Sequence, residues 1–492
     1  MSRARDTGRR HSGDRARRDA ATADGVAPGP AAAAARWDDA PCPAEAERRA
    51  GPGHPSSADD GAGGAPRAAG TVTVEDALTA RRRPWRAALG GAWARSPWWL
   101  AVLALYGLSR VWGWAVFSVV GGQQGPGPWG QGPLGYLDFV ATWDSDWYRT
   151  IFEHGYPSEL PRDSLGTVRE NPWAFYPVFP LLVRGITEVT GTGWAGTAST
   201  VSLLAGFGAA LVLYRLTCTA PVMSTPRTRG GASVPALWAV AVFAFNPVAP
   251  VLQTPYAEAL SLLFLLSAIL CVVRGRAAGA AVFVVLQALT RPTGVALAAA
   301  LGVWWLWRSV RDVRARCRAW YRCADRWLAV ALLACAAALA WPVIAWAVTG
   351  EPTAYTETEA AWRGSSGVVP VLPWFAQATR FLGPVAGLLA PVLLVAAAVL
   401  VLRSGPVRSA LPFFVRVWLA AYGCYLLLVL NPQSSTFRLL LPWAPLAAAL
   451  VRVSDSRAYR VLLVLGGALL QLVWVGWLWH WKQLPGGGDY PP

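Results

Sequence analysis

From Trp98 onward, the chain alternates apolar runs with short polar breaks that are rich in arginine. Many of these runs approach the roughly 20 apolar residues that an α-helix needs to cross a lipid bilayer. A segment in the bilayer core must also satisfy its backbone hydrogen bonds internally, which helices do. The pattern therefore predicts an all-α, polytopic membrane protein with about 11 transmembrane helices.

The first predicted span runs from about Trp99 to Val120 and follows a group of arginines between Arg81 and Arg95. The later spans are predicted at about 197–217, 233–251, 256–273, 277–290, 294–307, 327–348, 382–402, 411–430, 438–452 and 460–479.

Charged residues divide between alternate loops. Arginines fill the N-terminal tail and the loops 218–232, 274–276, 308–326, 403–408 and 452–460. Acidic residues gather in 121–195, at Glu258 and in 351–359. The positive-inside rule then predicts a multi-pass protein of the cell membrane with a cytoplasmic N-terminus and extracytoplasmic acidic loops. This distribution accounts for the net charge of +16 without a nucleic-acid partner.

Residues 173–190 (WAFYPVFPLLVRGITEVT) are apolar enough for a short span, but they contain two prolines and Arg184. If this segment crossed the membrane, the basic region 215–229 would face outward, against the charge rule. We therefore expect an interfacial or re-entrant helix within a large first extracytoplasmic loop.

The domain organisation follows from the same patterns. Residues 1–97 lack a long apolar run and are predicted to be a disordered, basic cytoplasmic tail. Residues 98–481 form the transmembrane domain, and 482–492 form a short C-terminal tail. Seven cysteines are scattered without a paired CxxC or His/Cys cluster, so neither a metal site nor another cofactor is predicted.

The stretch WDSDWY at 143–148, which continues to Glu153 and His154, has the composition of a site at the lipid–water boundary. Aromatic rings can lie against headgroups or a sugar ring while a carboxylate faces the reacting group. The alternative is an aromatic anchor with solvated acids. The side chains that would line a substrate here are Trp143, Trp147, Tyr148 and His154, beside the acids Asp144 and Asp146.

Further along the chain, Tyr256 and Glu258 follow a Pro-broken helix end at an outer boundary. Arg291, within TRPTG, is placed at the turn of a short helical hairpin, where a guanidinium needs an anionic partner. A lipid phosphate suits it, because arginine binds phosphate through two parallel hydrogen bonds. An internal salt bridge to Glu258 is the alternative. Arg438 repeats the arrangement after Pro432.

The outward segment EPTAYTETEAAWRG at 351–364 adds three acids together with Trp362 and Arg363, which are candidates for lining an acceptor side. No single element here is specific. The predicted topology places all of these elements on one face of the membrane, and this convergence indicates a site.

Several of these motifs together resemble bacterial members of the PIG-V family, which is named after the second mannosyltransferase of GPI-anchor assembly. They occur in order over about residues 98–480: WDSDWY, EHGYP, AFYPVFPLLVR, FNPVAPVLQTPYAEAL, LTRPTG, AAWRG and STFRLLLPWAPL. The resemblance implies a GT-C glycosyltransferase fold with an extracytoplasmic active site. It also implies a mannosyltransferase that uses a polyprenyl-phosphate-linked donor with inversion at the anomeric carbon.

The resemblance also implies roles for individual residues. Asp144 matches the Asp of the family's WD motif and would be the base for an acceptor hydroxyl. Glu258 matches the acid of a Tyr-x-Glu element, and Arg291 and Arg438 match arginines that we assign to the donor phosphate. Asp146 departs from the family pattern and either shares a proton with Asp144 or faces solvent.

Two other classes of function stay open at this point. A transporter or flippase of polyprenyl-linked sugars would also need Pro-broken helices and an intramembrane arginine. A catalytically inactive accessory subunit would keep the fold without the activity. The expected partners are the lipid donor, membrane lipids and an unidentified hydroxyl acceptor.

Overall fold

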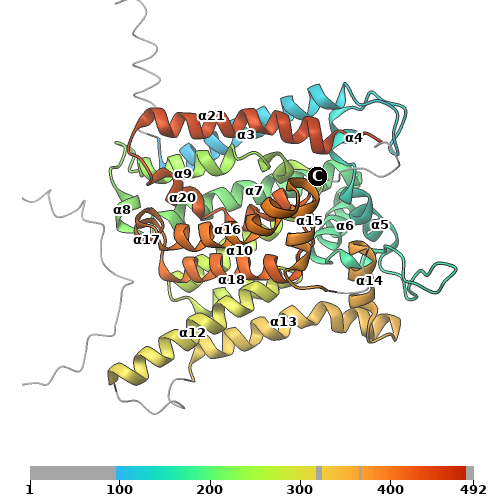
Figure 1. Cartoon of the computed structure of the whole chain (residues 1–492). Coiled ribbons are helices and arrows are strands. Elements are labelled where there is room, and N and C mark those ends of the chain that lie inside the picture. Colours follow the sequence, from blue (N-terminus) through green and yellow to red (C-terminus); the bar gives the residue numbers. More distant parts are fainter. Residues whose placement is uncertain (1–95, 317–323, 365–367, 484–491) are drawn as a thin grey trace, which may run out of the picture. The chain divides into compact units, whose positions relative to one another are not determined.

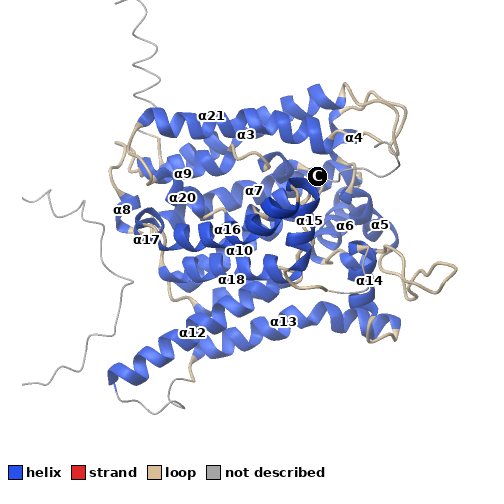
Figure 2. Ribbon diagram, viewed as in Figure 1, coloured by secondary structure: helices blue, strands red, loops and turns tan. Residues whose placement is uncertain are grey.

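The computed structural model describes residues 96–316, 324–364, 368–483 and 492, all within the unit Val74–Pro492. Helices make up its regular structure, and β-pairing in the described ranges is limited to three isolated bridges. Figure 2 shows this helical architecture. Most of the predicted tail 1–97 and of the C-terminal tail 482–492 lies outside the described residues, as do Cys42, Cys317 and Cys323.

Within the described ranges, five helices are long and apolar enough to cross a membrane, by length and composition. They are α3 (Trp98–Gly121), α7 (Trp194–Thr217), α13 (Arg326–Thr349), α16 (Pro384–Arg403) and α21, which continues through the π-helical turn η6 (Arg457–Trp474, then Val475–Trp479). Each coincides closely with a predicted span. The all-α membrane architecture is thereby confirmed, and the total of eleven crossings stays a prediction.

Four shorter helices and the 23-residue helix α12 cover most of the other predicted spans. These are α9 (Val234–Ala244), α10 (Glu258–Val273), α11 (Ala277–Ala288), α12 (Gly294–Arg316) and α18 (Phe413–Val429). The predicted limits need two corrections. Helix α12 continues to Arg316 rather than ending near 307, because its Arg-rich last turns stay helical. Helix α9 ends at Ala244, before Pro247, and is followed by the 3-10 turn η3 (Ala249–Gln253).

The predicted span 438–452 is also broken. It divides into α19 (Thr436–Leu439), the 3-10 turn η5 (Leu441–Trp443) and α20 (Leu446–Val451). Pro442 and Pro445 lack the amide hydrogen that an uninterrupted helix would use. The break places the short helix α19, with Arg438, at the inner edge of the site described below.

The segment predicted to be the first outer loop folds into short helices. They are α4 (Tyr136–Val140), α5 (Asp144–His154), the 3-10 turn η2 (Pro172–Ala174) and α6 (Val178–Thr190). At 13 residues, α6 is about 20 Å long, shorter than the roughly 30 Å bilayer core. Figure 1 shows α5, α6 and α14 (Ala354–Arg363) together at the right-hand end of the bundle.

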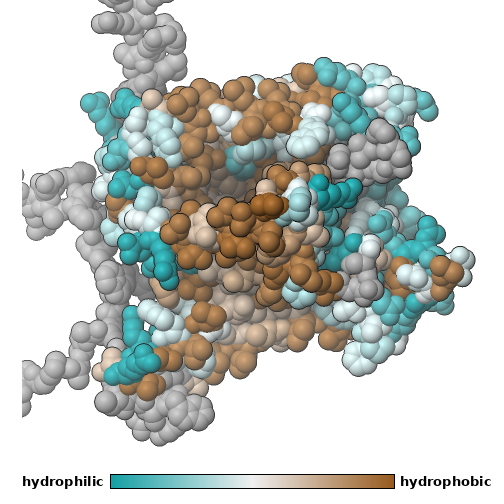
Figure 3. Space-filling view, viewed as in Figure 1, coloured by the Kyte–Doolittle hydropathy of each residue, from teal (hydrophilic) through white to brown (hydrophobic). Residues whose placement is uncertain are grey.

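The Arg-rich connections lie at the opposite end. Figure 1 shows α8 (Pro221–Ser224), α17 (Gly405–Ala410) and the end of α12 on the left. In Figure 3, hydrophobic side chains cover the middle of the view, and hydrophilic ones gather toward both ends. Helix α16 and its neighbour α15 (Leu372–Leu382) contribute to this apolar surface, and only Gly387 and Pro391 of the pair are buried.

One buried arginine bonds to the backbone of a neighbouring segment in the interior of the bundle, away from α5, α6 and α14. Arg110, in α3, is 5% exposed, and its Nη2 donates to the carbonyl oxygen of Ala244 at 2.9 Å. Its Nη1 donates to the carbonyl oxygen of Ala249. These carbonyls belong to the broken connection between α9 and α10, where Pro247 prevents a continuous helix. Arg110 thus supplies charged donors to the backbone on both sides of the break.

We predict that Arg110→Met lowers the free energy of unfolding by about 2 kcal/mol, because buried carbonyls lose a charged donor. Thermal unfolding in detergent measures the effect. Val111→Met is the matched control, since Val111 is the next residue on α3 and is 61% exposed. Equal midpoints for the two variants would contradict the structural role of Arg110.

Candidate active site

A pocket of about 560 Å³ opens at the end of the bundle that carries α5, α6 and α14. Its wall comes from α5, η2, the α11–α12 turn, α14, α18 and α19, which are far apart in sequence. The predicted site residues that line it are Trp143, Asp144, Asp146, Trp147, Tyr148, Arg291, Trp362, Arg363 and Arg438. The structure therefore brings most of the predicted residues to one place.

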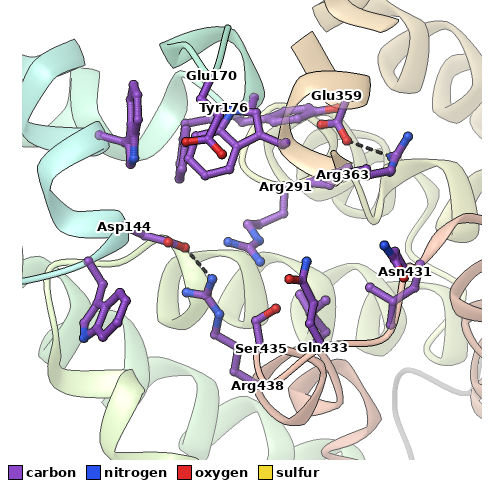
Figure 4. A pocket seen from close by; sticks show the side chains of 18 of the residues that line it. Asp144, Glu170, Tyr176, Arg291, Glu359, Arg363, Asn431, Gln433, Ser435 and Arg438 are labelled. Carbon is purple, nitrogen blue, oxygen red and sulfur yellow. Dashed lines mark hydrogen bonds and ion pairs between the residues drawn. The ribbon is translucent and has the colours of Figure 1, made fainter. Parts of the chain in front are cut away.

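Asp144 and Arg438 form the central ion pair. Arg438 Nη2 lies 2.5 Å from Asp144 Oδ2, and the two side chains are 9% and 16% exposed, respectively. Asp144 is the first residue of α5, where a carboxylate is favoured by the helix dipole. Figure 4 shows Asp144, Arg291 and Arg438 directed toward the same space.

Glu258 lies behind this pair and connects the two arginines. Its Oε1 is 3.2 Å from Arg291 Nη1 and 3.4 Å from Arg438 Nη1. Its side chain is only 6% exposed and borders a small internal cavity rather than the pocket. The internal salt bridge left open for Arg291 is thus present, and Arg291 still lines the pocket. Four buried or nearly buried charges compensate one another.

Arg438 retains hydrogen-bonding capacity in this network. Its Nε and Nη1 atoms are buried and make no hydrogen bond among the residues that the structure describes, although Nη1 lies within ion-pair distance of Glu258. A buried charged donor without a full set of acceptors is costly. An anionic oxygen entering the pocket would meet guanidinium groups from two separate elements.

Tyr256 supports Asp144 from below and does not line the pocket. Its hydroxyl accepts from the backbone N–H of Asp144 at 3.0 Å and donates to the carbonyl oxygen of Thr142 at 3.2 Å. Its ring lies under the Arg438 guanidinium, 5.2 Å from Cζ to the ring centre. The predicted substrate-lining place of Tyr256 is thereby corrected to a supporting one.

His154 does not reach the pocket either. It ends α5 on the exposed surface, whereas the pocket lies at the start of that helix. Eleven helical residues carry the chain about 16 Å, which is too far for a side chain at the end to contribute. Spacing along the sequence could not reveal which way α5 points.

Asp146 lies at the solvent-exposed rim and accepts a hydrogen bond from Trp129 Nε1. Partial burial is the main cause that raises the pKa of its carboxyl, and the bond from Trp129 acts against it. Trp129 itself was not predicted, because it stands among glycines and prolines in a segment without a periodic pattern.

On α14, Arg363, which was predicted to line the acceptor side, has an ion-pair partner. Arg363 Nη2 lies 2.8 Å from Glu359 Oε2, one helical turn away, and both residues line the pocket. Trp362 packs edge-on against Trp147, with the ring centres 5.1 Å apart.

Polar residues from the α18–α19 region complete the wall and were missed at the sequence level. Tyr422 and Tyr425 come from α18, and Asn431, Gln433 and Ser435 come from the following segment. They carry no motif by themselves, and only the fold brings them opposite α5. Where the structure describes the chain, no three His, Cys, Asp or Glu residues gather in a way that could hold a metal ion.

Comparisons with known proteins bear on this site. Residues 131–342 match the family described as mannosyltransferase (PIG-V), which confirms the predicted resemblance and, at family level, the prediction of a glycosyltransferase. The matched segment contains Asp144, Glu258 and Arg291, whereas Arg438 lies outside it. No curated protein sequence matches the chain significantly.

Among solved structures, the chain is similar to ArnT from Cupriavidus metallidurans, determined in a complex with undecaprenyl phosphate. The TM-score is 0.43 at 15% sequence identity, and the similarity covers 75% of this chain. It covers 63% of ArnT, so this chain spans just under two thirds of the length of that protein.

The titration of Glu359 tests the environment of the wall that α14 contributes to the pocket. Burial raises the pKa of its carboxyl above the ordinary value of 4.5, and Arg363 offsets part of this shift. An acid with a raised folded-state pKa contributes stability below its unfolded pKa and loses it as the pH rises through the folded value. We therefore predict that the unfolding midpoint of Glu359→Gln, relative to the wild type, increases between pH 4 and pH 7.

Thermal unfolding in detergent across that pH range measures this difference. Glutamine is neutral throughout, so it lacks the ionisation cost that the buried carboxyl meets at higher pH. A difference between the two midpoints that stays constant with pH would contradict the assigned environment of Glu359.

Proposed function

We propose, from the premise that residues 131–342 belong to the mannosyltransferase (PIG-V) family, that this chain transfers mannose from a polyprenyl-phosphate-linked donor to a hydroxyl acceptor. The observation that carries the proposal is the convergence of Asp144, Arg291 and Arg438 on one aromatic-lined pocket. A transfer of this kind requires a base for the acceptor and fixed cations for the departing phosphate. We also propose that the chain has the GT-C glycosyltransferase fold.

Arg291 and Arg438 are the proposed donor-phosphate contacts. Both line the pocket, and both also pair with Glu258 on the side away from it. Glu258 therefore holds the two guanidinium groups in place from behind. Fixed cations of this kind stabilise the negative charge that develops on the phosphate as the sugar departs.

Asp144 is the proposed base. Its carboxylate takes the proton of the acceptor hydroxyl, and the hydroxyl oxygen then forms the new bond to the anomeric carbon of the donor. The bond between that carbon and the phosphate oxygen breaks, and polyprenyl phosphate leaves with the electron pair. Attack opposite the leaving group inverts the anomeric centre. Arg438 contacts Asp144 and borders the donor side, so base and phosphate would be adjacent.

The extracytoplasmic location of the reaction is also proposed. The pocket lies at the end of the bundle opposite the Arg-rich connections, and the positive-inside rule assigns those connections to the cytoplasm. A lipid-linked donor suits this face, because soluble nucleotide sugars would be on the other side. Aromatic residues such as Trp147 and Trp362 are suited to packing against sugar rings in the pocket.

We predict that Asp144→Asn lowers the transfer rate at least about 100-fold, because asparagine cannot take the hydroxyl proton. The assay uses purified protein in lipid vesicles, polyprenyl-phosphate-mannose labelled in the sugar, and a panel of lipid-glycan, polymer and peptide acceptors. Asp138→Asn is the matched control, since Asp138 is exposed on the same outer loop and does not line the pocket.

Transfer that survives in Asp144→Asn would overturn the base assignment. If no acceptor is modified by the wild type while the donor moves between vesicle leaflets, the flippase alternative is favoured. If neither transfer nor movement occurs with any acceptor tested, the proposed activity fails and the accessory-subunit alternative stands.

For the donor contacts, we predict that Arg291→Gln raises the KM for the lipid donor about 10-fold or more, because a charge-assisted pair with phosphate is lost. The KM for the acceptor should change much less. Arg184→Gln is the control, since Arg184 is exposed on α6 and pairs only with Glu188 among the ion pairs of that helix. An unchanged donor KM in a folded Arg291→Gln protein would exclude a phosphate contact.

A further inference from the structure

The residue immediately before the proposed base has an unfavourable backbone conformation. Trp143 has φ 61° and ψ −127°, and it is one of two non-glycine residues with positive φ in the described part of the chain. Such a conformation is strained and persists only where the surrounding structure imposes it. It sets the direction in which α5 starts, and therefore where Asp144 points.

The C-terminal end of the membrane domain supplies contacts that hold this conformation. The indole Nε1 of Trp143 donates to the carbonyl oxygen of Trp479 at 2.9 Å. The indole Nε1 of Trp479 donates in turn to the carbonyl oxygen of Phe139, also at 2.9 Å. Trp479 is fully buried and ends the π-helical turn Val475–Trp479. The 139–143 segment is therefore bonded to residues more than three hundred positions away.

Two further contacts complete this support. Trp479 packs against Tyr256, with ring centres 5.2 Å apart, and Tyr256 accepts from the backbone N–H of Asp144. After the turn, the backbone of Trp481 makes two hydrogen bonds with the Gln124 side chain: its N–H donates to Oε1 at 3.0 Å, and its carbonyl accepts from Nε2 at 3.1 Å. The C-terminal segment is thus held by contacts at Trp479 and at Trp481.

From these contacts we propose that the C-terminal segment 475–481 is a positioning element of the active site, with Trp479 as its main residue. It imposes the backbone conformation of Trp143 and so directs Asp144 toward the pocket. The segment lies outside residues 131–342, which match the family, and it does not line the pocket. This inference rests on the proposed role of Asp144 as the base.

The physical basis is the balance between strain and support. Without the Trp479 contacts, the segment 139–143 can relax to an ordinary backbone conformation, because less of the surrounding structure opposes it. The start of α5 would then shift relative to Arg438. Displacement of a catalytic group by about 1 Å is enough to lower a rate about 100-fold. Donor binding through Arg291 would be affected much less, because the contacts described above join this segment to residues 124–143 and to Tyr256, whereas Arg291 lies on the α11–α12 turn.

The test is Trp479→Phe, which removes the indole donor to Phe139 and keeps an aromatic ring against Tyr256. The expected result is a kcat lowered about 10-fold with the KM for the lipid donor within about two-fold of the wild type. Trp477→Phe is the matched control, since Trp477 lies on the same turn and is 61% exposed. The thermal unfolding midpoint of each variant is measured to verify that the variant is folded at the assay temperature.

A double-mutant cycle separates positioning from general loosening of the fold. If Trp479 acts through Asp144, then Trp479→Phe lowers the wild-type rate but has little further effect on the residual rate of Asp144→Asn. An equal loss in both backgrounds would overturn the proposal, as would an unchanged kcat in Trp479→Phe. If Asp144→Asn itself keeps full activity, the proposed function fails first, and the two failures are distinguishable.

Gln124→Leu reaches the same segment from its other side and covers the case in which Trp479→Phe does not fold. It removes both hydrogen bonds to the Trp481 backbone without touching the pocket. The expected effect is a smaller loss of kcat, about three-fold, again absent in the Asp144→Asn background. A loss that persists in that background would contradict positioning through Asp144.

Discussion

The pairing of Asp144 and Glu258 with Arg291 and Arg438 is the interaction on which the pocket end of the bundle depends. Each charge lies at the edge of an apolar bundle, where an uncompensated ion is costly. The four residues come from α5, α10, the α11–α12 turn and α19. Their mutual neutralisation therefore requires four separate elements to meet, and it places them where helices are broken or begin.

Broken helices make this meeting geometrically feasible. An uninterrupted span would carry its backbone groups past the site. The break near Pro247 instead precedes α10, which begins at Glu258 behind the pocket, and the breaks near Pro292 and Pro442 bring a turn and the short helix α19 to the pocket itself. The backbone groups that these breaks release need other partners in a bilayer. Arg110 supplies donors at the first of them. The same prolines thus shape the site and create a need for buried polar support elsewhere.

Arg438 links the ion-pair network to the proposed transfer reaction. It pairs with the proposed base, contacts Glu258 and still has buried donors that make no hydrogen bond among the described residues. A phosphate at this position would join a network that already contains both signs of charge, so its binding would redistribute hydrogen bonds rather than add an isolated anion. The strained Trp143 and the C-terminal turn keep Asp144 beside this arginine.

Much of this arrangement could be predicted from the sequence, because membrane spans and their orientation depend on local composition. Apolar runs indicated the positions of the long helices, and the alternation of arginines with acids separated the two ends. Motif resemblance then selected Asp144, Arg291 and Arg438, which the pocket brings together. These predictions depended on residues close together in the chain or on motifs that keep a fixed order.

Long-range packing alone sets which side chains face the pocket and which stand behind it. Glu258 and Tyr256 stand behind the pocket and support residues that line it, and His154 lies outside it. The spacing of residues in the sequence does not reveal in which direction a helix continues after a turn. The link between Trp143 and Trp479 joins segments more than three hundred residues apart and leaves no local pattern. By itself, the sequence determined the helical membrane class, the sidedness of charge and the key motif residues. The fold decided their partners, because long-range packing sets which helix ends share a space.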